Sequence, residues 1–283
     1  MRHSGKAAAI VGVGLWLVFL AVPQPGLAKI RCQRGSGGAV LSVSVTEGTF
    51  AGLRRKGEEI AVFDLLTRKR KCETGATVGN TDQIKIFAGP SASAFIQLVK
   101  GPFAPGLSAD EDDSPEIEIE ASGPGYIEVI GTPAPDHYRF LDVGLQSGVN
   151  LNPEEDQDLD VTVARNSREE MLFVVGSAAG NDRIDAQGAP ALEMFASGGD
   201  GNDTLVSASI GAILEGERGA DRLIGSPGFD LIVPGRGADR VTAVGGSDLI
   251  EMNPDRSRDR INCGPGFDLV TTGDRFDRLT ACP

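Results

Sequence analysis

The stretch Ser197-Gly198-Gly199-Asp200-Gly201-Asn202-Asp203-Thr204-Leu205-Val206 joins a glycine-rich, acidic segment to a short apolar end. Glycine allows the backbone conformations of a tight turn, and aspartate supplies a hard oxygen ligand. The Leu-Val end is typical of a short buried strand. One such stretch is a weak signal, so its recurrence along the chain decides the fold.

The aspartate of this stretch recurs to the end of the sequence. After Asp203 the steps are 18, 9, 9, 9, 11, 9 and 9 residues, to Asp221, Asp230, Asp239, Asp248, Asp259, Asp268 and Asp277. Glycine stands two positions before most of these aspartates, at Gly219, Gly228, Gly237, Gly246 and Gly266. An aliphatic residue stands two positions after each, at Leu205, Leu223, Ile232, Val241, Ile250, Ile261, Val270 and Leu279. A nine-residue period of this composition predicts a parallel β-roll.

A second period, of 18 residues, lies inside the first. Alternate aspartates are followed by arginine, at Arg222, Arg240, Arg260 and Arg278, and the others by leucine, at Leu231, Leu249 and Leu269. One coil of the roll therefore contains two strands and two turns, and residues one coil apart stack at the strand spacing, about 4.8 Å. We expect the leucine column to face outward beside Phe229 and Phe267, where it either packs on the chain's own loops or docks a partner.

Four cysteines fall as two pairs at opposite ends of the chain. Cys263 and Cys282 are 19 residues apart, one coil plus one residue, so neighbouring rungs bring them within disulfide distance. We expect a second bridge between Cys32 and Cys72, since an even number of cysteines in an exported chain favours disulfides.

Upstream of the regular repeats the apolar period continues but becomes longer and less regular. Apolar centres recur at steps of mostly ten to twelve residues, near Ile84, Ile96, Ile117, Ile127, Phe140, Val149, Val161, Leu172, Ile184 and Met194. The fold class is therefore all-β: a parallel β-roll or β-solenoid with an N-terminal β cap. We expect the cap at residues 29–75, degenerate solenoid turns at 76–175 and the regular roll, with its C-terminal disulfide, at 176–283.

The first 28 residues have the pattern of a signal peptide. Arg2 and Lys6 precede an apolar run, Ala7 to Val22, and Gly26-Leu27-Ala28 provides a small-residue cleavage site. The sequence thus predicts a secreted, extracellular protein, and no second apolar run is long enough to span a membrane.

Net charge argues against two kinds of partner. The chain has 27 basic and 40 acidic residues, a formal charge of −13, which becomes −15 without Arg2 and Lys6. This excess disfavours nucleic acid and anionic membranes and favours cations. A protein or surface-glycan partner stays open.

Gly198 to Val206 resembles the nonapeptide of the RTX, or haemolysin-type, calcium-binding repeat family, in its exported actinobacterial form. Later repeats, such as Gly225 to Ile232, match it in part. The resemblance implies calcium held between stacked turns by the repeat aspartate and turn carbonyls. It implies no single activity, because such repeats occur in proteins of many functions. We therefore expect a non-enzymatic, calcium-binding repeat protein with a structural or surface-interaction role.

The resemblance also selects candidate ligands. The best single site pairs Asp200 with Asp203, completed by the carbonyls of Gly199 and Gly201 and by Asp221 one coil on. Glu217 is a further candidate beside it. The other column members are weaker candidates: Asp230, Asp239, Asp248 and Asp268.

Arginine offers an alternative to calcium on one edge of the roll. Arg218, Arg236 and Arg256 stand three positions before their aspartates, where the family often has Asp or Asn, and Arg222, Arg240 and Arg260 directly follow the same aspartates. An Asp–Arg ladder there would give a metal-independent adhesive or structural solenoid.

A third alternative is a β-helical polysaccharide lyase or epimerase. Asp136-His137-Tyr138-Arg139 contains the residue types that proton abstraction beside a sugar carboxylate requires. These residues are consecutive in a predicted strand, so their side chains alternate between faces and cannot all converge.

Overall fold

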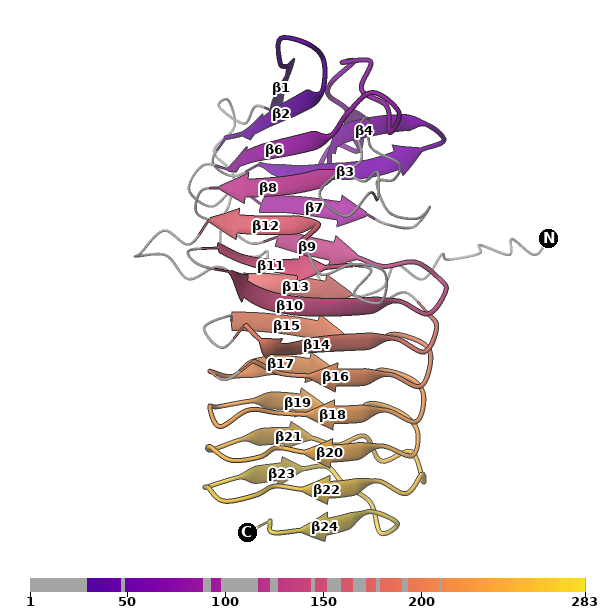
Figure 1. The fold of residues 1–283 in the computed structure, drawn as a ribbon. Coiled ribbons are helices and arrows are strands. Elements are labelled where there is room, and N and C mark those ends of the chain that lie inside the picture. Colours follow the sequence, from indigo (N-terminus) through magenta and orange to yellow (C-terminus); the bar gives the residue numbers. More distant parts are fainter. Residues whose placement is uncertain are drawn as a thin grey trace, which may run out of the picture.

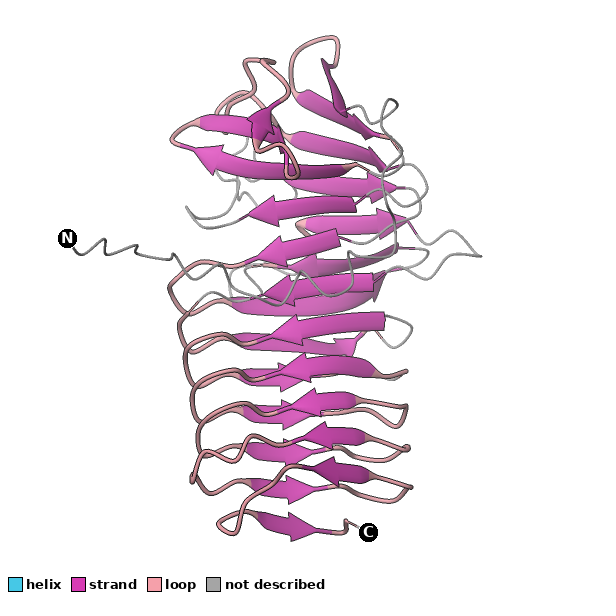
Figure 2. Ribbon diagram, turned by 180° about the vertical axis from the view of Figure 1, so that it is seen from behind, coloured by secondary structure: helices cyan, strands magenta, loops and turns pink. Residues whose placement is uncertain are grey.

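A computed structural model of the chain describes residues 30–46, 49–88, 93–97, 117–122, 127–143, 146–151, 159–164, 172–176, 179–189, 193–208 and 210–282. The predicted signal peptide lies outside these ranges. The described residues contain strands and no helix. Two sheets face each other along a solenoid, with the N-terminal strands at one end and the C-terminal strands at the other (Figures 1 and 2). This arrangement confirms the predicted all-β solenoid.

Sheet A has 13 strands. In spatial order they are β1 (Ile30–Arg34), β2 (Val40–Val45), β6 (Gln83–Ala88), β8 (Glu118–Ser122), β12 (Val161–Ala164), β11 (Gln146–Asn150), β10 (His137–Val143), β14 (Arg183–Gly188), β16 (Thr204–Val206), β18 (Arg222–Ile224), β20 (Arg240–Thr242), β22 (Arg260–Asn262) and β24 (Arg278–Thr280).

Sheet B has 11 strands. In spatial order they are β23 (Leu269–Thr271), β21 (Leu249–Glu251), β19 (Leu231–Val233), β17 (Ala212–Glu215), β15 (Glu193–Ser197), β13 (Leu172–Gly176), β9 (Ile127–Ile130), β7 (Ser93–Gln97), β3 (Phe50–Lys56), β4 (Glu59–Asp64) and β5 (Lys69–Arg70).

The C-terminal half is a regular roll in which each strand has about three residues. Strands of one sheet pair in parallel one coil apart, as in Leu223 with Val241 and Ile232 with Ile250. The middle residue of each strand points inward, and the core column is fully or nearly fully buried at Leu205, Leu214, Leu223, Ile232, Val241, Ile250 and Ile261. Each such side chain contributes about 1.5–3 kcal/mol by leaving water, so stacked aliphatics supply the core without large aromatics.

The middle of the solenoid departs from the continuous parallel winding that the sequence predicts. Strand β10 turns back into β11 as an antiparallel hairpin, and β11 pairs antiparallel with β12. Parallel winding continues on both sides, because β12 pairs with β8 and β10 with β14. Phe140 and Val149 face each other in the hairpin and are fully buried, so the apolar spacing is kept although the strand direction reverses.

The N-terminal cap closes the solenoid with antiparallel pairs, β1 with β2 and β3 with β4, before β2 and β3 pair in parallel with β6 and β7. A disulfide joins Cys32 to Cys72, with a Cα–Cα distance of 5.8 Å.

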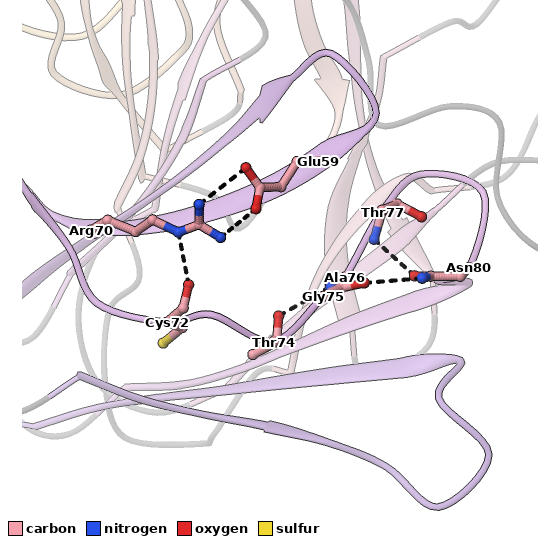
Figure 3. A network of polar contacts seen from close by, with 8 residues as sticks. All are labelled: Glu59, Arg70, Cys72, Thr74, Gly75, Ala76, Thr77 and Asn80. Carbon is pink, nitrogen blue, oxygen red and sulfur yellow. Dashed lines mark hydrogen bonds and ion pairs between the residues drawn. The ribbon is translucent and has the colours of Figure 1, made fainter.

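Polar contacts hold the segment around Cys72 and the turn that follows it (Figure 3). Arg70 binds the Glu59 carboxylate with both terminal nitrogens and donates from Nε to the Cys72 carbonyl at 3.0 Å. Asn80 accepts from the Thr77 N–H at 2.8 Å and donates to the Gly75 carbonyl at 3.0 Å. Three of these contacts satisfy backbone groups of the segment, namely the carbonyls of Cys72 and Gly75 and the N–H of Thr77.

The C-terminal end is bridged by Cys263 and Cys282, whose Cα atoms lie 5.1 Å apart. Cys263 is fully buried below β22, and the bridge ties the segment after β24 to the preceding coil. Beyond β24 the core column is uncovered: Leu279 is 49% exposed, whereas its neighbour Ile261 is buried.

The leucine column lies on the outer face of sheet B, as predicted. Leu231, Leu249 and Leu269 are in register on β19, β21 and β23. Leu231 and Leu249 are half-buried, Leu269 is 59% exposed, and the neighbouring Phe267 is 91% exposed.

Close stacking of the turns explains the glycine two positions before most of the repeat aspartates. Gly219 has a φ of 145°, a conformation that favours glycine. A Cβ built on it would lie 1.4 Å from the carbonyl oxygen of Gly201 in the preceding coil. Gly237 has the same relation to the Gly219 carbonyl, at 1.5 Å. The pitch of the roll therefore leaves no space for a side chain here.

We predict that Gly219→Ala destabilises the protein by about 2–4 kcal/mol, because the added Cβ separates two coils. Urea unfolding followed by circular dichroism measures the loss. Gly79→Ala is the matched control, since a Cβ there meets nothing within 4 Å. Equal stability of the two variants would contradict the stacking argument.

Candidate metal site in the stacked turns

The repeat aspartates form a hydrogen-bonded ladder on one edge of the roll. The backbone N–H of each aspartate donates to Oδ1 of the aspartate in the next coil. The links run from Asp136 to Asp182 (2.6 Å), Asp182 to Asp203 (2.7 Å), Asp203 to Asp221 (2.8 Å), Asp221 to Asp239 (2.8 Å), Asp239 to Asp259 (2.9 Å) and Asp259 to Asp277 (3.2 Å). One carboxylate oxygen of each turn thus fixes the preceding turn.

The opposite edge carries a shorter ladder of the same kind. Ala212 N–H donates to Asp230 Oδ1 at 2.7 Å, Asp230 to Asp248 at 2.9 Å, and Asp248 to Asp268 at 3.0 Å. The alternation of the nine-residue repeat between the two sheets places successive aspartates on opposite edges.

The second carboxylate oxygen defines the candidate site. Oδ2 of five ladder aspartates is buried without a hydrogen-bond partner: Asp203, Asp221 and Asp239 on the first edge, Asp248 and Asp268 on the second. For Asp203 this oxygen lies against the first glycine of its own turn, since a Cβ on Gly198 would be 2.4 Å from it. An anionic oxygen buried in this way needs a cation or a proton.

Asp230 differs from the other predicted ligands. Its Oδ2 accepts the Ser226 N–H at 2.6 Å and the Ser226 hydroxyl at 3.2 Å. The need for a cation is therefore smaller at this turn, although the sequence gives Asp230 the same position as Asp248 and Asp268.

Asp200 does not join Asp203 in the structure. Its side chain is exposed, with Oδ1 3.8 Å from an Arg218 nitrogen, while Asp203 is buried. Glu217 accepts a hydrogen bond from the Ser197 hydroxyl at 2.7 Å. No group of three or more His, Cys, Asp or Glu side chains with metal-binding geometry occurs in the described ranges. The oxygens available to a metal here are single Oδ2 atoms of successive coils and the carbonyls of the turns.

Within the described ranges, no arginine forms an ion pair with Asp221, Asp239 or Asp259, so the alternative Asp–Arg ladder is not seen there. Arg222, Arg240 and Arg260 are exposed on the outer face of sheet A, whereas the aspartates before them point into the turn. Consecutive residues entering a strand point to opposite sides, so sequence neighbours cannot pair here. The ion pair between Arg218 and Asp200 is exposed and contributes little to stability.

The cluster at residues 136–139 does not come together as a whole. The Tyr138 hydroxyl and the Asp136 carboxylate lie close to each other, since a Cβ on Gly131 would be 2.3 Å from the first and 2.5 Å from Oδ2 of the second. Arg139 is exposed, and Asp136 also accepts hydrogen bonds from the backbone and hydroxyl of Thr132. Asp136 is the first residue of the aspartate ladder and caps its own turn.

Two ladder members were missed by sequence reasoning. Asp182 has the repeat pattern, with Gly180 two before it and Ile184 two after, but stands 21 residues before Asp203. Asp136 lies 46 residues before Asp182. The Gly-Asn-Asp triplet shared by Asp182 and Asp203 is the signal that identifies the first of the two.

Burial shapes the electrostatics of both ladders. It raises the pKa of Asp221 and of Asp239 to about 7, against the lowering effect of the hydrogen bond each accepts. The carboxyls of neighbouring coils add to the increase. Burial likewise raises the pKa of Asp248 and Asp259 to about 6.

Comparison with known proteins agrees with this geometry. Stacked coils with glycine-rich, aspartate-containing turns define a parallel β-roll. Residues 195–209 and 215–250 match the family model of the RTX calcium-binding nonapeptide repeat, in four copies. This part of the chain is therefore an RTX repeat segment, and RTX nonapeptide repeats bind calcium.

Neither the curated proteins nor the solved structures gave a match. Within the described ranges, no helix has the length and apolar character needed to cross a membrane.

The raised pKa values predict an unusual pH dependence for the calcium-free protein. Because the folded pKa of Asp221 and Asp239 lies above the unfolded value, protonation favours the folded state at acidic pH. This stabilisation is lost as the pH rises through about 7. We expect the thermal midpoint measured in chelator to decrease as the pH is raised from about 5 to about 8.

Asp221→Asn/Asp239→Asn tests the origin of this fall. Asparagine keeps an oxygen that accepts the N–H of the preceding coil, but it does not ionise. The thermal midpoint of this variant should therefore change less with pH than that of the wild type. A wild-type midpoint that increases over the same range would refute the prediction. Thermal melts followed by circular dichroism supply both measurements.

Proposed function

We propose that this protein is an exported, calcium-binding repeat protein with a structural or surface-interaction role, in which calcium between stacked turns stiffens the roll. The observation that carries the proposal is the set of five buried Oδ2 atoms without a partner on Asp203, Asp221, Asp239, Asp248 and Asp268. Within the described residues, no cationic side chain pairs with any of these carboxylates.

The chemistry of the donors suits calcium. Ca²⁺ takes six to eight hard oxygens, from carboxylates and backbone carbonyls, in flexible geometry. The turns offer carboxylate Oδ2 atoms and glycine carbonyls one coil apart. Calcium would supply the positive charge that otherwise has to come from protons.

Export is supported by the pattern of residues 1–28 and by the two disulfides, which favour an oxidising compartment. Calcium outside cells is abundant, so moderate affinity is enough to keep the roll loaded. The protein would then be most rigid after it has left the cell.

The role expected of the roll is non-catalytic. RTX repeat segments are typically structural, and the residues at 136–139 that suggested acid–base chemistry are divided between the core and the surface. The favoured alternative to a calcium-dependent roll is a roll in which protons alone neutralise the buried carboxylates.

Thermal melts at about pH 7.5 in chelator and in excess calcium test the proposal. A ligand at about 100 times its Kd adds about 2.7 kcal/mol, which corresponds to an increase of roughly 5–10 °C in the midpoint. Asp221→Asn should lose a large part of this increase. Asp230→Asn is the matched control, because Ser226 already satisfies Oδ2 there. No increase in the wild type would rule out a calcium-stiffened roll.

A further inference from the structure

The outer face of sheet A presents an uninterrupted column of arginines. Arg222, Arg240, Arg260 and Arg278 are in register on β18, β20, β22 and β24, which stack at the C-terminal end of the roll (Figure 1). All four side chains are exposed. At a strand spacing of about 4.8 Å, the column is about 14 Å long.

These arginines have no anionic neighbour on their own face. In the described part of the chain, none of the four forms an ion pair or a side-chain hydrogen bond. Like charges directly opposite each other on adjacent strands are destabilising. The column therefore has four cationic groups whose repulsion is relieved only by an anion from outside.

The turn beside the column carries both signs of charge, and the strands add polar groups. Arg218 and Arg236 stack in this turn and are exposed, and Arg218 lies 3.8 Å from the exposed Asp200. The next rungs of the turn hold Asp255 and Asp274, which accept the N–H groups of Gly237 and Arg256. Two residues along the same strands, Thr242, Asn262 and Thr280 form a parallel polar column. Hydroxyl and amide groups thus accompany the guanidinium groups at the same spacing.

We propose that this arginine column binds a linear anionic polysaccharide, with one carboxylate or sulfate group held at each rung. The guanidinium fork matches planar carboxylate and sulfate oxygens bidentately. The neighbouring Thr and Asn side chains suit sugar hydroxyls. The negative net charge of the protein is screened beyond about 8 Å at physiological salt, so the local column dominates close contact.

The same face disfavours single-stranded nucleic acid as the occupant. Binding of that kind uses aromatic side chains on which bases stack. The outward positions of β18, β20, β22 and β24 are Arg, Ile, Thr and Asn, with no aromatic residue among them.

Isothermal titration calorimetry with dextran sulfate, polygalacturonate (which has a carboxylate on every sugar) and uncharged dextran tests the proposal, at about 50 mM and about 200 mM salt. The purified protein should bind at least one of the two anionic polymers, more weakly at the higher salt, and should not bind dextran. Preference between the two distinguishes sulfate from carboxylate recognition. Binding to neither polymer, or tighter binding to oligothymidine, would overturn the proposal.

Arg240→Gln/Arg260→Gln locates the site. We expect this pair to reduce the affinity by about tenfold or more, because it removes the two central forks. Arg31→Gln/Lys69→Gln removes the same charge from exposed positions of the N-terminal cap and should leave the affinity within about twofold. Equal losses in both variants would mean that overall charge, and not the column, determines binding.

Thermal melts of both double variants check that the roll is intact. If Arg240→Gln/Arg260→Gln lowers the midpoint, Arg222→Gln/Arg278→Gln replaces it, with the same expected loss. The calcium test changes buried aspartates of the turns, Asp221 and Asp230, whereas the polysaccharide test changes exposed arginines of sheet A. Calcium stabilisation and polysaccharide binding can therefore fail independently.

Discussion

The hydrogen bond from the N–H of one repeat aspartate to Oδ1 of the next sets the geometry of the roll. It fixes the distance between coils and brings the turns so close that Gly219 meets the carbonyl of Gly201. It also buries each carboxylate at the edge of the core, since its oxygen has to reach the backbone of another coil. The glycine requirement and the buried negative charge both follow from this one contact.

The two oxygens of each carboxylate then have separate roles. Oδ1 is structural and is already occupied, whereas Oδ2 at Asp203, Asp221 and Asp239 has no hydrogen-bond partner among the described residues. A bound proton or cation satisfies it, and the two compete because they neutralise the same charge. Where a local backbone N–H and hydroxyl already donate to Oδ2, as those of Ser226 do for Asp230, the need for either is smaller.

The regular half of the fold can be predicted from sequence because its period is constant. Residues one coil apart are in register, and the Cys263–Cys282 spacing follows directly. The antiparallel hairpin at Phe140 and Val149 was not predictable, because apolar spacing carries no information on strand direction. The alternative Asp–Arg ladder, suggested by arginines three positions before and directly after the aspartates, is not seen among the described residues. The strand turns Arg222 away from Asp221, and Arg218 lies near the exposed Asp200 instead. The unpaired Oδ2 atoms depend on three-dimensional burial and appear only in the structure.

The longer step from Asp248 to Asp259 has a consequence for how the molecule can vary. Two extra residues enter the turn after β21, where Arg256 adopts a φ of 73°, and yet Asp239 still bonds Asp259 at 2.9 Å. The extra residues are thus absorbed at the turn, while the core residue and the ladder bond stay in register with the neighbouring coil. Because each regular coil contacts only its neighbours, adding or removing one would change the length of the roll without altering the contacts within the remaining coils.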